Sequence, residues 1–260
     1  MECRCGAVPN KSTSIMSISI NIPRLALCVI LCAPLHHALG DDFVVTSFGA
    51  TGEKDEYAGQ FIQDAIDACV AAGGGRVVLP PGDYTTGTIV LGDHVDLHLE
   101  AGATLWASRD AGHYNTGLKI YKQNRTGDPE EGLTRVLIYA KEAGHISITG
   151  KGVVHGQAQR VYGPLRQVDG FIAAETENAR RSGVPMERWY KEEPHSTMVF
   201  LESCSDVLVR DVRLIESSEW TLHFKWCDRV TVQGVYIESS LEQGVNADGI
   251  DIDRSEERRV

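Results

Sequence analysis

The chain has 260 residues, 42% of them hydrophobic, which is enough for one sizeable domain. Its 26 glycines and few aromatic residues argue against a helical bundle. The formal net charge is −11, and because residues 1–40 carry +2, the rest of the chain carries −13. Such acidity disfavours nucleic acids and anionic membranes as partners.

Residues 1–40 have the pattern of a signal peptide. An apolar run at 25–33 follows Arg24, and positions 38–40 read Ala-Leu-Gly, the small-x-small form of a cleavage site. The run is short for a membrane-spanning helix, although an uncleaved anchor is the alternative. We therefore expect a secreted or periplasmic protein that begins at residue 41 and has no membrane contact after cleavage.

The mature part begins with one helix and continues as short β-runs. Apolar residues recur at helical spacing over 57–72, and three glycines at 73–75 end the pattern. From 77 to 148, short runs of Val, Leu and Ile are separated by Gly, Pro and Asp, which predicts strands and turns. Residues 156–195 are polar and charged, and we interpret them as a long insertion over one face.

An internal repeat indicates the architecture. Five apolar positions recur at an offset of 23 residues, pairing Cys204 with Cys227, Val207 with Val230, Val209 with Val232, Val212 with Val235 and Leu214 with Ile237. This is about the length of one solenoid coil, and the absence of helical patterning between the runs makes the coils β. We therefore predict a parallel β-helix over 41–260, with the helix at 57–72 capping its N-terminal end. Chance similarity between two β-rich segments is the alternative.

Cysteines are sparse in the mature part. Of the seven cysteines only Cys69, Cys204 and Cys227 lie after residue 40. An odd and sparse set is not a disulfide framework. We expect each of the three to be a buried free thiol.

The densest carboxylate cluster lies at 246–253 and reads Asn-Ala-Asp-Gly-Ile-Asp-Ile-Asp. Alternate residues of a strand face opposite sides, so an offset of 23 places Asn246 above His223 and Asp248 above Lys225 on an outer face. The ammonium group would lie about 5 Å from the carboxylate of the next coil. Such a polar patch could bind an anionic sugar ring.

Two other interpretations of this cluster stay open. The patch can be a solvated polar face with routine ion pairs. The spacing of Asp248, Asp251 and Asp253 also resembles a set of ligands for a hard cation such as calcium. Because Asp251 and Asp253 alternate with isoleucines as in a strand, we expect surface carboxylates there, with no metal and no cofactor.

With these features the sequence resembles the polygalacturonase-type glycoside hydrolases, glycoside hydrolase family 28, within the pectin-lyase-like right-handed β-helices. The resemblance covers residues 43 to 253 approximately. Motifs typical of the superfamily stand at 48–50, 65–68, 73–75, 79–84 and 97–103. Motifs similar to the hydrolase branch stand at 220–223, 227 and 246–251. The resemblance implies an all-β, right-handed parallel β-helix.

The resemblance also implies inverting hydrolysis of α-linked pectic glycans. Asp248 would help to activate the attacking water, and Asn246, His223 and Lys225 would bind the substrate. An inverting site needs a second carboxyl group about 6.5–9.5 Å away. In the family this group comes from an Asp-Asp pair on the following coil, which is not among these 260 residues. Ala247 stands where polygalacturonases usually carry Thr, which leaves rhamnogalacturonan open beside galacturonan as the substrate.

The last residues break the β pattern. Residues 254–260 resemble the in-frame translation of a sequencing adapter, so we expect an artefactual tail and a natural chain that continues past Asp253. A genuine terminus is the alternative. We expect the 260-residue chain to be a monomer without activity. The alternatives to a secreted pectin hydrolase are a non-catalytic carbohydrate-binding β-helix and a calcium-dependent pectate lyase.

Overall fold

The computed structural model describes residues 42–121, 133–164, 177–183, 189–191, 194–240 and 247–253. These all belong to one compact unit, 38–260. The predicted signal peptide, the predicted artefactual tail and Asn246 lie outside the described residues. In the part of the chain that is described, no helix combines the length and the hydropathy that crossing a membrane requires.

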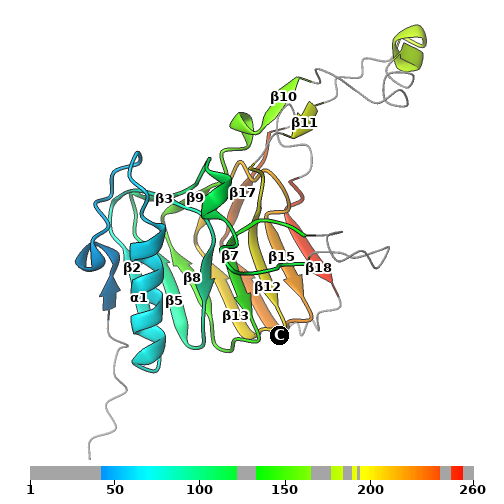
Figure 1. Cartoon of the computed structure of the whole chain (residues 1–260). Helices are drawn as coiled ribbons and strands as arrows, with labels where there is room; N and C mark the ends of the chain where they lie inside the picture. The colour runs from blue at the N-terminus through cyan, green and yellow to red at the C-terminus, as the bar shows by residue number, and fades with distance from the viewer. Residues whose placement is uncertain are drawn as a thin grey trace, which may run out of the picture. The chain divides into compact units, whose positions relative to one another are not determined.

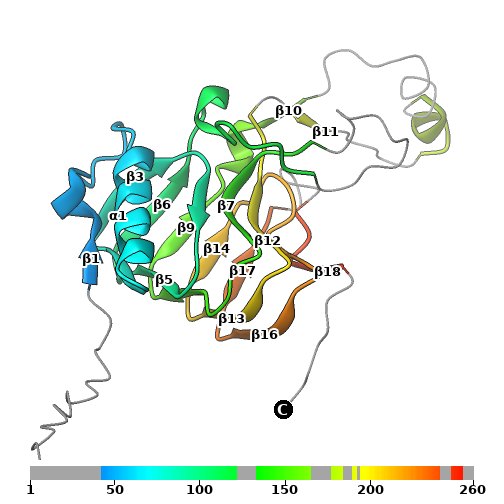
Figure 2. The same ribbon diagram turned by 60° about the horizontal axis from the view of Figure 1, so that its bottom comes forward.

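Three parallel sheets form the body of the molecule (Figures 1 and 2). Sheet A contains β1 (Asp42–Val44), β2 (Gly75–Leu79), β5 (Val95–Leu99), β8 (Ser147–Gly150), β13 (Ser205–Arg210) and β16 (Asp228–Gln233). Sheet B contains β3 (Gly82–Thr86), β6 (Ala103–Ala107), β9 (Val153–His155), β14 (Arg213–Ile215) and β17 (Tyr236–Glu238). Sheet C contains β4 (Ile89–Leu91), β7 (Val136–Lys141), β12 (Thr197–Glu202), β15 (Leu222–Lys225) and β18 (Ile250–Asp253).

The chain visits the sheets in the order A, B, C and repeats this order five times after β1. Each strand therefore pairs with the corresponding strand of the preceding and following coil, and all these pairs are parallel. The predicted right-handed parallel β-helix is confirmed. The predicted 23-residue repeat is also confirmed, because Val207 pairs with Val230 and Leu214 pairs with Ile237.

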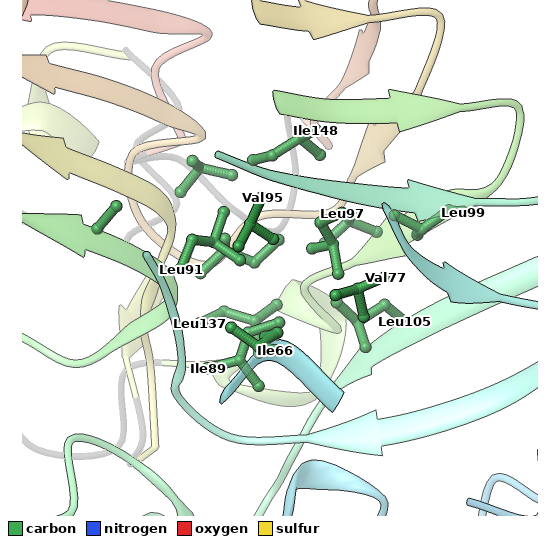
Figure 3. Close-up of a cluster of buried hydrophobic side chains, with 14 of the residues drawn as sticks. Ile66, Val77, Ile89, Leu91, Val95, Leu97, Leu99, Leu105, Leu137 and Ile148 are labelled. Carbon is green, nitrogen blue, oxygen red and sulfur yellow. The ribbon is translucent and has the colours of Figure 1, made fainter. Parts of the chain in front are cut away.

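Inward-facing apolar side chains stack into ladders along the axis of the β-helix. In sheet A, Val77, Leu97 and Ile148 occupy the same position of successive coils and are buried (Figure 3). Leu91 of sheet C and Leu105 of sheet B meet this ladder from the other two sides. Burying each such side chain contributes about 1.5–3 kcal/mol, so the stacked coils stabilise one continuous core.

The helix α1 (Gly59–Ala71) covers the first coil, as expected from the pattern at 57–72. Figures 1 and 2 both show it against the N-terminal end of the sheets. Its buried face includes Ile62, Ile66 and Cys69. The helix ends where the backbone of Gly74 donates a hydrogen bond to the carbonyl oxygen of Cys69 at 2.9 Å, with Gly74 at a φ of 115°.

The connections between sheets differ greatly in length. Those from C to A and from A to B contain two to five residues. Those from B to C range from two residues to the segment 156–196, which contains the predicted insertion. This segment carries β10 (Tyr162–Pro164), which pairs antiparallel with β11 (Trp189–Lys191). The short helices of the described residues are η1 (Val45–Phe48), η2 (Ala111–His113), η3 (Ala158–Arg160) and a helical turn at 177–181.

Candidate functional site

The pairing of β15 with β18 differs from the sequence prediction. His223 is the register partner of Asp251, and Lys225 is the register partner of Asp253. The prediction that Asn246 lies above His223 and Asp248 above Lys225 is therefore wrong for Asp248, while Asn246 lies outside the described residues. Asp251 and Asp253, which we expected to be surface carboxylates outside the site, are therefore the residues that lie beside His223 and Lys225.

A longer connection causes this difference. Between β12 and β15 the offset is 23 residues, since Phe200 pairs with His223. The connection before β15 is 216–221, whereas the connection before β18 is 239–249, which is five residues longer. The offset from β15 to β18 is therefore 28 residues, and Asp251 takes the place that the constant repeat assigns to Asn246.

Asp248 lies at the edge of sheet C where its strands begin. Its side chain is exposed, and its carbonyl oxygen accepts a hydrogen bond from the backbone of Thr221 at 2.9 Å. That register places Asp248 opposite Trp220 of the preceding coil. Asp248 thus lies two residues before β18, near the end of the connection from sheet B to sheet C.

His223 lies on the outer side of sheet C but is covered by two aromatic rings. Its ring is stacked on Phe200 with centroids 4.6 Å apart, and it meets the Trp220 ring edge-on at the same distance. Only 1% of His223 is exposed. The imidazole is thus fixed by aromatic contacts rather than presented to solvent.

Lys225 belongs to a charged cluster on the same outer face. Its Nζ lies 3.7 Å from Oε1 of Glu202, 3.5 Å from the carbonyl oxygen of Tyr121 and 4.4 Å from the centre of the Trp226 ring. The Lys225 side chain is 13% exposed, so its ammonium is close to the surface but held on several sides. An ammonium group held in this way is suited to a carboxylate ligand.

Glu202 is the centre of this cluster. Its Oε2 accepts a hydrogen bond from the hydroxyl of Tyr139 at 3.1 Å and lies 3.7 Å from Nζ of Lys141. Burial is the main cause that raises the pKa of Tyr139, and the neighbouring Glu202 adds to it. Tyr139 therefore remains a neutral hydrogen-bond donor. Glu202 thus lies between two lysines, and Asp251 and Asp253 of β18 lie on the same face, so the face carries both cationic and anionic groups.

The sequence prediction missed several residues of this face. Glu202 is the register partner of Lys225 at the offset of 23 residues that identified the repeat. The repeat could therefore have predicted that Glu202 lies beside Lys225. Trp226 is 46% exposed beside Lys225 and had no signal in the periodicity. At the edge where the strands begin, His195 lies 3.8 Å from Glu219, a pair that the motifs did not indicate.

The structure gives no support to a cation site. Within the described ranges, no group of three or more His, Cys, Asp or Glu side chains is placed to hold a metal ion. Asp251 and Asp253 belong to strand β18 and alternate with Ile250 and Ile252, as expected. Because the two carboxylates are spaced along one side of an extended strand, they do not form the compact loop that calcium sites use.

Comparisons with known proteins point to one class. No family model matches the sequence. Over 115 residues the chain is 34% identical to an exo-poly-alpha-D-galacturonosidase of Dickeya chrysanthemi, a match that covers 43% of this chain and 19% of that protein. Over 225 residues it is 23% identical to a probable polygalacturonase of Vitis vinifera, covering 83% of this chain and 40% of that protein.

A solved structure shows the same architecture. The family 28 exopolygalacturonase of Yersinia enterocolitica is 20% identical and superposes with a TM-score of 0.60, covering 83% of this chain and 41% of that chain. The molecule therefore shares the parallel β-helix fold of this exopolygalacturonase. Its fold is polygalacturonase-like, and this chain spans less than half the length of the curated relatives that it matches.

Proposed function

We propose that the protein is a glycosidase of the polygalacturonase type, which hydrolyses α-linked pectic polysaccharide with inversion at the anomeric carbon. The observation that carries this proposal is the outer face of sheet C, where an exposed carboxylate, Asp248, precedes β18 and the neighbouring strand β15 carries the partly buried Lys225 and the buried His223. The similarity to a galacturonosidase over 115 residues supports the same chemistry. We further propose a secreted or periplasmic monomer that needs no cofactor.

Asp248 is the proposed catalytic residue, which helps to activate the attacking water. Its position ahead of β18 leaves the carboxylate exposed, so water and a polysaccharide can both reach it. The inverting mechanism needs a second carboxyl group about 6.5–9.5 Å away to protonate the leaving oxygen. We expect that group from a coil beyond the described residues.

Lys225 is the proposed partner of a substrate carboxylate. Galacturonate units carry one negative charge each, and Lys225 and Lys141 offer ammonium groups on this face to such a carboxylate. His223 is proposed to act by holding Trp220 and the start of β18 in place, because its own ring is buried. Asn246 is proposed to bind substrate beside Asp248, as the resemblance implies.

The first test is the reaction itself. The complete protein, including the coil that we expect to supply the second carboxyl group, is incubated with polygalacturonate and with rhamnogalacturonan, whereas the 260-residue chain alone should be inactive. Newly formed reducing ends are measured together with the anomeric configuration of the first product. We expect reducing ends with inverted configuration and no dependence on added calcium. Calcium-dependent formation of unsaturated products, or binding of pectin without any cleavage, would contradict the proposal.

The second test distinguishes Asp248 from Asp251, the carboxylate that the register places beside His223. In the complete protein, we expect Asp248→Asn to lower kcat by about 10²–10⁴-fold with little change in KM. Asp251→Asn should raise KM more than it lowers kcat, because Asp251 is the register partner of His223 in the neighbouring strand β15. The exposed Asp64→Asn on α1 is the matched control and should leave both constants unchanged. A larger loss of kcat in Asp251→Asn would move the catalytic role to that residue.

A further inference from the structure

Cys204 and Cys227 occupy the same position of two neighbouring coils. They lie at the corner between sheets C and A, flanked by the register pairs Glu202–Lys225 and Ser205–Asp228. The backbone of Asp228 donates a hydrogen bond to the carbonyl oxygen of Cys204 at 2.9 Å, so the pairing continues through the corner. Neighbouring strands are about 4.8 Å apart, which lies within the Cα separation of roughly 4.4–6.8 Å that disulfides span.

Both thiols point into the core and contact one another. Cys204 is 1% exposed and Cys227 is 2% exposed. The thiol of Cys204 donates a hydrogen bond to the carbonyl oxygen of Glu202 at 3.4 Å, and that of Cys227 donates one to the carbonyl oxygen of Leu201 at 3.3 Å. The interaction between the two thiols raises the pKa of Cys204 and lowers the pKa of Cys227. The same position holds Ala143 in the preceding coil, because Gly144 pairs with Ser205. A column of small side chains at this corner leaves the room that two sulfur atoms need.

In the structure the three described cysteines, Cys69 included, are free thiols, as expected from the sequence. The geometry points to a further role for two of them: we propose that Cys204 and Cys227 are an oxidative cross-linking site, which joins successive coils of the β-helix by a disulfide in an oxidising compartment. This role is independent of the proposed hydrolase activity, because neither sulfur lies on the outer face of sheet C.

The cross-linking reaction needs a disulfide oxidant, such as oxidised glutathione. The Cys227 thiolate attacks one sulfur of this oxidant, which forms a mixed disulfide and releases one glutathione thiolate. Cys204 then loses its proton to solvent and attacks the Cys227 sulfur, which releases the second glutathione thiolate. The protein loses two electrons and two protons, and the oxidant gains the two electrons. Because both sulfurs are buried, we expect the reaction during folding or during opening of this corner.

The cross-link would close a loop of one coil and so restrict the unfolded chain. Successive β-helix coils are also held by backbone hydrogen bonds, stacked side chains and ion pairs such as Arg229–Asp206. The side chains of a parallel ladder stand roughly one strand spacing apart, which is somewhat more than the Cβ separation of about 3.5–4.5 Å in relaxed disulfides. We therefore expect a cross-link that dithiothreitol reduces readily once the corner opens.

The experiment uses the whole chain refolded with oxidised and reduced glutathione, and separately with dithiothreitol. Free thiols are alkylated under denaturing conditions, and the protein is digested with trypsin. Each sulfur then lies in its own tryptic peptide, 192–210 for Cys204 and 226–229 for Cys227. We expect a linked pair of these two peptides in the oxidised sample only, and a Tm about 5–10 °C higher than in the reduced sample.

Two variants separate this cross-link from other thiol chemistry. Cys69→Ala removes a buried thiol elsewhere and should leave the linked peptides and the rise in Tm unchanged. Cys227→Ala should abolish both while leaving peptide 192–210 fully alkylated. Complete alkylation of both cysteines in the oxidised wild-type protein, or linkage of either one to a different cysteine, would overturn the proposal.

Discussion

Phe200 and His223 lie in neighbouring coils with their rings stacked at 4.6 Å and only 14° between their planes. They are register partners of β12 and β15, so the parallel pairing itself brings the rings together. Both rings are buried, although they lie on the outer side of sheet C.

We predict that this stack contributes measurable coupling energy. In a double-mutant cycle of Phe200→Leu and His223→Leu, the interaction term should be about 0.5–1.5 kcal/mol, because both leucines fill space but cannot stack. Urea unfolding of the four proteins measures the term. The same cycle with Tyr139→Leu and His223→Leu is the control, since those residues are two coils apart. Equal terms in the two cycles would contradict a specific stack.

The core ladder predicts a large difference between two leucines. Leu97→Ala should lower the free energy of unfolding by about 2–5 kcal/mol, because Leu97 is fully buried in the centre of sheet A and its loss leaves a cavity. Leu118→Ala is the matched control and should cost less than about 1 kcal/mol, since Leu118 is exposed. Denaturant titration followed by circular dichroism compares them. Similar costs would show that the core ladder does not dominate stability.

Alanine substitutions at two glycines can distinguish the cost of backbone strain from the cost of a steric clash. Gly73 has a φ of 90°, and a Cβ added there would have no atom within 4 Å, so Gly73→Ala should cost only the strain of about 1–2 kcal/mol. Gly150 has a φ of 106°, and its added Cβ would lie 1.9 Å from the carbonyl oxygen of Leu99. Gly150→Ala should therefore be clearly more destabilising. The urea midpoints of the two variants measure the difference, and equal midpoints would contradict the clash.

His155 predicts a pH dependence of stability. Burial, and then the charge of Lys54, lowers the pKa of His155 from 6.5 to about 4. Glu216 lies 3.8 Å away and would act in the opposite direction, but burial raises the pKa of this carboxyl and so weakens its effect. The unfolded chain takes up the proton near pH 6.5 and the folded chain only near pH 4. Stability should therefore fall as the pH drops through this window, by at most about 3 kcal/mol and by less where solvent screens the ring.

Urea midpoints between pH 7 and pH 4 test this dependence, in steps across the window of His155. The His155→Gln variant should lack most of the loss, because its amide does not titrate. The exposed His94→Gln variant is the control and should keep the wild-type profile. A profile that is unchanged in His155→Gln would assign the loss to other groups.

Much of the fold could be predicted from the sequence, because the repeat and the fold depend on the same residues. The apolar matches between 204–214 and 227–237 are the inward-facing positions of sheets A and B, where short connections keep the spacing constant. The register of Asp248 could not be predicted in this way. It depends on the length of the connection 239–249, and polar connections have no periodicity to measure.

The prediction of outward-facing residues was similarly limited. The alternation of Leu222 and Phe224 correctly predicted an outward direction for His223, since both apolar residues lie in the core. Alternation says nothing about what covers the outer face. The ring of Trp220 and the stack on Phe200 come from neighbouring segments, and their effect on His223 becomes visible only in three dimensions.

The unequal connections have a consequence for how such a molecule can change. Two of the three corners of the β-helix, from sheet C to A and from sheet A to B, are turns of two to five residues. The rise from coil to coil therefore stays constant along these two corners. The third corner, from sheet B to sheet C, accommodates connections as different in length as 87–88 and 156–196, and the coils that they join keep the same three strands. Foreign loops grafted at that corner should therefore leave the β-helix intact. They should change only the surface beside the beginning of each strand of sheet C.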